Sequence, residues 1–235
     1  MTGENAPGAI SRRALMAGGL SAPVIGATLG NGPAAADRMP VTPDEALERL
    51  ITGNARYVAN TPINTDFSYQ RAERAMGQQP FAAIVSCADS RVAPELIFDQ
   101  GPGELFVVRV AGNFINDDGL ASLEFGAAVL GIKMIVVLGH TSCGAVRATI
   151  SSIEDNTLPP GHLPSLVNAI RPAVYEAMAD NPADLMAAAT ARNAQLSALR
   201  AGTAKPILST LGEEGRLKSA AAIYDISTGK VNFLA

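Results

Sequence analysis

The chain of 235 residues has no tryptophan, and aromatic residues make up only 5% of it. Two cysteines are too few for a framework of disulfides. The net charge is −4, and the basic residues are scattered rather than gathered in a patch that could neutralise phosphates, which argues against a nucleic-acid partner. Hydrophobic residues reach 48%, enough for a large core, so the composition excludes a disordered chain.

Histidine is as scarce as cysteine, with two residues of each, and three of these four residues follow two apolar runs. Phe81–Ser86 is followed by Cys87, and Met134–Gly139 is followed by His140 and Cys143. Both runs predict buried strands. In an open parallel sheet the carboxyl ends of the strands form the edge at which sites occur. The sequence therefore places its rarest reactive side chains at one edge of a sheet.

The rest of the chain alternates between strand and helix patterns. Further strands are predicted at 105–110, 220–226 and 230–234, and helices at 43–59, 119–130, from about 143, 163–178 and 182–200. This alternation predicts an α/β fold with a mainly parallel central sheet flanked by helices. The last two strands read as a hairpin around Thr228-Gly229, which would add an antiparallel edge strand. We expect one catalytic domain over residues 37–235.

The first 36 residues have the pattern of a targeting segment. Ser11-Arg12-Arg13 resembles the twin-arginine export motif, no charged residue occurs from 14 to 36, and Pro33-Ala34-Ala35-Ala36 offers a cleavage site of small residues. Residues 1–36 therefore predict a twin-arginine-type signal peptide and a periplasmic protein without a membrane segment after cleavage. A membrane anchor is the alternative, although the glycines and prolines of this stretch make it weakly apolar and a poor helix.

Cys87, His140 and Cys143 supply two thiolates and an imidazole, a set that suits tetrahedral zinc. Three protein ligands leave a fourth position open, as in catalytic zinc sites. The expected cofactor is one Zn²⁺ ion per chain. Two thiolates neutralise the ion, so it should acidify bound water less than a site with three imidazoles, and a neighbouring group would have to assist.

Asp89 and Arg91 are the candidates for that assistance. Two residues apart in an extended strand tip, they can face the same side as Cys87. Asp89 could ligate zinc itself as the fourth ligand, or it could pair with Arg91 and accept a hydrogen bond from zinc-bound hydroxide. The residues alone leave both states open.

Three plainer readings compete with a catalytic site. Cys87 and Cys143 could form a disulfide in an oxidising compartment. The Asp89–Arg91 pair could be an ordinary exposed ion pair. The zinc could also be purely structural, with Asp89 as its permanent fourth ligand.

Three blocks in this order and spacing resemble the β-class carbonic anhydrases: Cys87-Ala88-Asp89-Ser90-Arg91-Val92, Pro102-Gly103-Glu104-Leu105-Phe106-Val107-Val108-Arg109 and Gly139-His140-Thr141-Ser142-Cys143-Gly144. The resemblance runs from about Asp44 to Phe233. It implies zinc-dependent, reversible hydration of carbon dioxide to bicarbonate and a proton by zinc-bound hydroxide. Cys87, His140 and Cys143 would be the ligands, and Asp89 and Arg91 the catalytic dyad.

The same resemblance implies a homodimer or homotetramer with the active site at the dimer interface. Gln78 matches a glutamine that reaches the substrate across that interface, Phe106 and Phe125 match apolar pocket positions, and Gly144 matches a backbone contact. Many relatives carry tyrosine at the Phe125 position. Two other functions remain open: a hydrolase of carbonyl sulfide or carbon disulfide on the same zinc site, and a non-catalytic zinc-binding dimeric module.

One departure from the family concerns regulation. Some members hold an inhibitory bicarbonate with an arginine, a tyrosine and a tryptophan. Arg109 and Tyr224 match the first two, whereas Ile84 stands at the tryptophan position. We therefore expect no bicarbonate switch.

Overall fold

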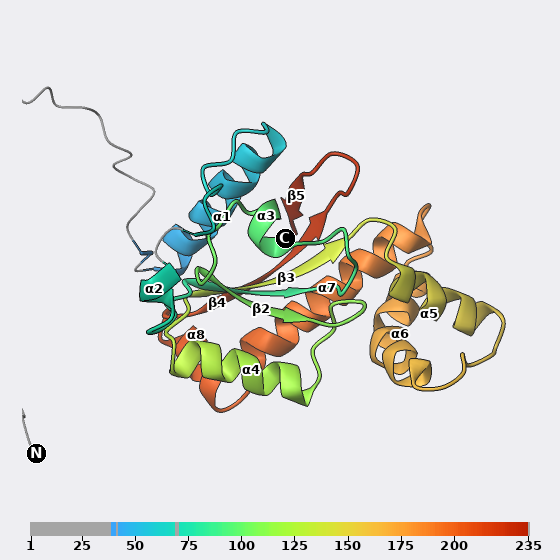
Figure 1. The fold of residues 1–235 in the computed structure, drawn as a ribbon. Helices are drawn as coiled ribbons and strands as arrows, with labels where there is room; N and C mark the ends of the chain where they lie inside the picture. Colours follow the sequence, from blue (N-terminus) through green and yellow to red (C-terminus); the bar gives the residue numbers. More distant parts are fainter. Residues whose placement is uncertain (1–38, 41, 69–70, 235) are drawn as a thin grey trace, which may run out of the picture. The chain divides into compact units, whose positions relative to one another are not determined.

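The structure is a computed structural model that describes residues 39–40, 42–68 and 71–234. The predicted signal peptide lies outside these residues. The helices and strands follow in chain order (Figure 1): α1 (Pro43–Val58), α2 (Arg71–Arg74), β1 (Ala82–Ser86), α3 (Pro94–Ile97), β2 (Leu105–Arg109), α4 (Asp117–Ala128), β3 (Met134–His140), α5 (Gly144–Glu154), α6 (Leu163–Ala179), α7 (Leu185–Thr203), α8 (Ile207–Glu213), β4 (Lys218–Tyr224) and β5 (Val231–Phe233). Within the described ranges, no helix combines the length and apolar character needed to cross a membrane.

The five strands form one sheet in the order β2-β1-β3-β4-β5. The first three pairings are parallel, and β5 adds the predicted antiparallel edge to β4. The chain leaves β1 for β2 on one side and then returns to place β3 on the other side of β1. Such a reversal opens a crevice beyond the carboxyl ends of the two central strands. The predicted fold class is confirmed, and Cys87 and His140 lie at that reversal.

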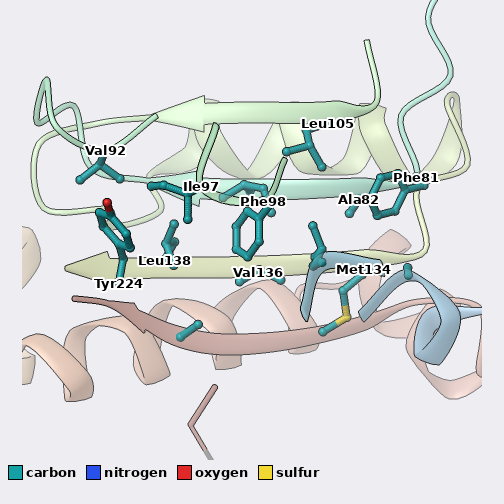
Figure 2. Close-up of a cluster of buried hydrophobic side chains, with 14 residues drawn as sticks. Phe81, Ala82, Val92, Ile97, Phe98, Leu105, Met134, Val136, Leu138 and Tyr224 are labelled. Atoms are coloured by element: carbon teal, nitrogen blue, oxygen red, sulfur yellow. The ribbon is translucent and has the colours of Figure 1, made fainter. Parts of the chain in front are cut away.

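Helices cover both faces of the sheet. Alternate side chains of β1 and β3, such as Ile84 and Leu138, pack against α1 and α3 in one cluster, and Figure 2 shows Phe98 of the α3 end over Val136. Val85 and Val137 point to the opposite face, where α4, α7 and α8 pack. The central strands are buried on both faces, which explains why they read as continuous apolar runs rather than alternating ones.

Two buried polar residues fix α1 to the rest of the fold. The Asn54 side chain donates to the carbonyls of Ile97 and Gly229 and accepts from the amide of Val231. The Asp99 carboxylate accepts from the Arg56 guanidinium and from two backbone amides of the 61–64 segment. Through these bonds α1 is tied to both α3 and the β4–β5 hairpin.

The sequence missed two short helices and misjudged one segment. The α3 and α8 helices have four and seven residues, too few for a helical period to be recognised. The segment after β1 was expected to be an extended tip, but it is a turn, in which the amide of Val92 donates to the carbonyl of Asp89. The other predicted helices and strands are present, with ends shifted by a few residues.

Gly53 allows α1 to cross the end of α3. A Cβ atom at this position would lie 1.8 Å from the carbonyl oxygen of Phe98, which is a backbone atom rather than the end of a flexible side chain. We therefore expect Gly53→Ala to destabilise the protein by about 1–3 kcal/mol or more in urea denaturation. Gly212→Ala in α8, where a Cβ has ordinary contacts, should be neutral or stabilising. Equal unfolding midpoints for the two variants would contradict the close crossing.

Candidate metal centre

Cys87 is the first residue after β1, and its thiol is almost completely buried. Its Sγ atom accepts hydrogen bonds from two backbone amides, those of Asp89 at 3.4 Å and Gly112 at 3.3 Å. Two N–H donors to the sulfur favour the thiolate, which is the form that binds metal.

His140 is the last residue of β3 and is fully buried. Its Nδ1 atom lies 3.0 Å from the carbonyl oxygen of Thr141, so Nδ1–H donates to that oxygen. Nε2 is then the lone-pair nitrogen. It is buried and has no hydrogen-bond partner among the described residues, which is costly unless a metal ion uses the lone pair.

Cys143 is buried and lies at the N-cap of α5, where its side chain makes no capping hydrogen bond. Ser142 before it adopts φ 59°, the left-handed conformation that costs a non-glycine residue energy. This turn reverses the chain between β3 and α5, so that the side chains of His140 and Cys143 face the same metal position.

The ligand atoms of Cys87, His140 and Cys143 all lie within 4.8 Å of one another. The hydrogen bond from Cys143 lowers the pKa of the Cys87 thiol to about 4, against the opposing effect of burial. The same bond, together with burial, raises the pKa of Cys143. Both cysteines are free, so the alternative disulfide is absent from the structure. The donor set fits zinc.

Asp89 is bound to Arg91 rather than to the ligand cluster. The Arg91 side chain donates to both carboxylate oxygens at 2.9 and 2.7 Å, and its backbone amide donates to Oδ1 at 3.0 Å. These bonds hold the pKa of Asp89 well below its usual range. Oδ2 lies 4.0 Å from Nε2 of His140. Of the two predicted states of this carboxylate, the structure has the one paired with Arg91.

Arg109 of β2 holds the turn that carries Cys87 and Asp89. Its Nε donates to the carbonyl of Cys87 at 3.0 Å, and one terminal nitrogen donates to the carbonyl of Asp89 at 2.7 Å. From the sequence, Arg109 is only a match to a regulatory position. Its two hydrogen bonds to the Cys87 turn are missed, because contacts between neighbouring strands leave no local sequence pattern. Ile84 is fully buried in the core, and the Tyr224 hydroxyl lies 3.2 Å from that of Tyr57.

The predicted substrate residues are placed differently. Gly144 is exposed at the start of α5, directly after Cys143. The rings of Phe106 and Phe125 face each other with centroids 6.5 Å apart, but Phe106 pairs with Ala83, four residues before Cys87 on β1. Gln78 is exposed between α2 and β1, four residues before β1 begins. Within one chain Gln78, Phe106 and Phe125 lie away from the metal ligands, whereas Gly144 is next to one of them.

Comparisons with known proteins identify the family of the chain. The family model described as carbonic anhydrase matches residues 82–231. Carbonic anhydrase 2 of Mycobacterium tuberculosis is 49% identical over 138 residues, 58% of this chain and 67% of that protein. The carbonic anhydrase of Pseudomonas aeruginosa is 37% identical over 169 residues, 67% of this chain and 74% of that protein. The solved β-carbonic anhydrase CcaA has 28% identity and a TM-score of 0.61, covering 81% of this chain and 92% of that one.

The chain belongs to the carbonic anhydrase family, in its β class. Enzymes of this class use zinc, and Cys87, His140 and Cys143 are positioned to bind it.

Arg109→Met should test the two hydrogen bonds that Arg109 makes to the turn carrying Cys87 and Asp89. Loss of both hydrogen bonds frees the carbonyls of Cys87 and Asp89, so we expect a 10–100-fold lower kcat/KM for the hydration reaction, as is typical for loss of an outer-shell partner. Stopped-flow kinetics with zinc quantified per chain would measure it. Arg216→Met, which removes an exposed arginine paired with Glu214, is the matched control. Equal rates in the two variants would show that these two hydrogen bonds are dispensable for catalysis.

Proposed function

We propose that this protein catalyses the reversible hydration of carbon dioxide to bicarbonate and a proton. The observation that carries the proposal is the convergence of three zinc ligands beside a carboxylate that Arg91 holds away from the metal position. A purely structural zinc site needs a fourth ligand and no such pair.

The residues of the chain divide the work. Zinc, when bound, supplies an acidified water as nucleophile. Cys87, His140 and Cys143 hold the ion, and the hydrogen bond from His140 to Thr141 directs Nε2 toward it. Arg91 keeps Asp89 ionised, so that its Oδ2 beside His140 is available as a hydrogen-bond acceptor that would orient the nucleophile.

We infer that the working unit is a homodimer, or a homotetramer built from dimers. Strand β2 is an edge of the sheet, with Phe106 only partly buried, and Met76 near Gln78 is 84% exposed. Because Gln78 lies just before the start of β1 and the zinc ligands lie at or after the ends of β1 and β3, its predicted role requires a second copy of the chain. Light scattering of the purified protein would test this, and a monomer with full activity would contradict it.

Export to the periplasm through the twin-arginine route is a further part of the proposal. Its support is the motif Ser11-Arg12-Arg13 and the small-residue site that ends at Ala36. This route carries folded proteins, so zinc could bind before the thiolates meet an oxidising compartment. Replacing both arginines by lysine should leave the protein in the cytoplasm with its leader uncleaved, as cell fractionation would reveal.

The main competing function is hydrolysis of carbonyl sulfide or carbon disulfide on the same zinc site. One preparation, with zinc quantified per chain, should be assayed on all three gases. We expect carbon dioxide to be turned over far faster than either sulfur compound. A preference for a sulfur compound would replace the proposal, and a zinc-loaded protein inactive on all three would indicate the non-catalytic dimeric module.

A further inference from the structure

The orientation of His140 depends on one peptide group. Its ring is hydrogen-bonded through Nδ1 to the carbonyl oxygen of Thr141, so the direction of that carbonyl determines where Nε2 points. The next residue, Ser142, is in the left-handed conformation. Thr141 therefore lies between a metal ligand and a strained turn, and something outside this segment has to hold it.

Thr141 is held by the end of β4 and the residues after it. Its amide donates to the carbonyl of Tyr224 at 3.0 Å, and its side-chain Oγ1 accepts from the amide of Ile226 at 3.1 Å. The first bond continues the ladder between β3 and β4, in which His140 is paired with Tyr224. The second bond lies beyond the ladder, and it requires a hydroxyl at residue 141.

The hairpin loop that offers the Ile226 amide is itself well fixed. Asp225 accepts from the amide and hydroxyl of Ser227 and from the hydroxyl of Thr228, and its own amide donates to Lys230. Asn54 of α1 binds the far side of the loop at Gly229 and Val231, each at 2.9 Å. A continuous series of hydrogen bonds thus joins α1, the hairpin loop and the His140 turn.

We propose that the Thr141 hydroxyl is a positioning group for zinc: it fastens the β4–β5 hairpin to the His140 turn and so fixes the imidazole in its ligating orientation. The inference rests on the zinc site of the proposed function but not on its substrate. Thr141 touches neither zinc nor carbon dioxide in this role. It acts through the carbonyl that accepts from His140, as outer-shell partners of zinc-bound histidines do.

The test is the rate of zinc release from the full-length protein into a chromogenic chelator, together with the visible absorption of the cobalt-substituted form. Thr141→Val keeps the shape and removes the hydroxyl. It should release zinc about 10–100-fold faster and alter the cobalt spectrum. Thr141→Ser keeps the hydroxyl and should restore both properties to nearly parental values. Thr141→Ala is a second hydroxyl-free variant and should behave as the valine variant does.

Thr210→Val is the matched control, because it removes an exposed threonine hydroxyl that donates to the carbonyl of Pro206 at the start of α8, outside the hairpin and the His140 turn. It should leave zinc release and the cobalt spectrum unchanged. Parental zinc release in Thr141→Val, or equal acceleration in Thr210→Val, would overturn the positioning role while leaving the zinc enzyme intact. A parent protein that holds no zinc would overturn the proposed function as well.

Discussion

Replacing His140 by alanine should strip the protein of zinc and of hydration activity. Two thiolates would remain, and the site would lose the only neutral ligand of its set. Loss of an outer-shell partner typically costs 10–100-fold, so loss of a direct ligand should lower kcat/KM by more than about 100-fold. Zinc content by atomic absorption and stopped-flow hydration would measure the two effects on the same preparation.

The chain provides a matched control in its other histidine. His162 is exposed at the start of α6 and makes no capping hydrogen bond there. His162→Ala should keep both zinc and activity. If His140→Ala retained a full complement of zinc, the assignment of this residue as a ligand would be wrong.

Asp99→Ala should be among the most destabilising substitutions away from the site. The carboxylate is 1% exposed and lies 2.5 Å from the Arg56 guanidinium, and it also accepts from the amides of Ile63 and Asn64. Removing one partner of a buried ion pair costs about 3–5 kcal/mol, because the other charge is left uncompensated. Glu176→Ala, which breaks a half-exposed pair with Arg192, should leave the unfolding midpoint almost unchanged.

The effect of Asp99 should depend on pH. Burial alone would raise the pKa of this carboxyl, but the hydrogen bonds from Arg56 and from the backbone amides outweigh burial and lower it. A carboxyl with a lowered folded-state pKa contributes stability above its unfolded value, about 3.9, and loses it as the pH falls through the folded value. The difference in unfolding free energy between parent and variant should thus be complete at pH 7 and shrink below about pH 4. A difference independent of pH would mean that the carboxylate charge does not stabilise the fold.

The metal centre could be predicted because its information is local. Cys87, His140 and Cys143 each follow or end an apolar strand, and parallel strands bring their carboxyl ends to one edge. The pairing of Asp89 with Arg91 was also anticipated as one of two states. Its cause differs from the one expected, since a turn with a backbone bond to Asp89 replaces the extended tip.

The supporting structure could not be predicted because it depends on pairs distant in sequence. Asn54 and Asp99 are of residue types that usually lie at the surface, yet both are buried by distant partners. Asn54 binds groups 43 and 175 positions away in the sequence, and Asp99 binds Arg56, 43 positions away. The hydrogen bonds of Arg109 and the hydrogen bond between Thr141 and Ile226 likewise join separate strands and loops. The predicted role of Gln78 depends on contacts with a second chain, which neither the sequence nor the structure of one chain can reveal.

The most direct test of the account is stopped-flow hydration of carbon dioxide by the purified protein, with zinc quantified per chain, from about pH 6.5 to about pH 9. We expect rapid hydration at one zinc ion per chain, already present near neutral pH because Arg91 holds Asp89 away from the metal, and lost in Asp89→Ala. A fully zinc-loaded protein that hydrates no carbon dioxide at any pH would contradict the account.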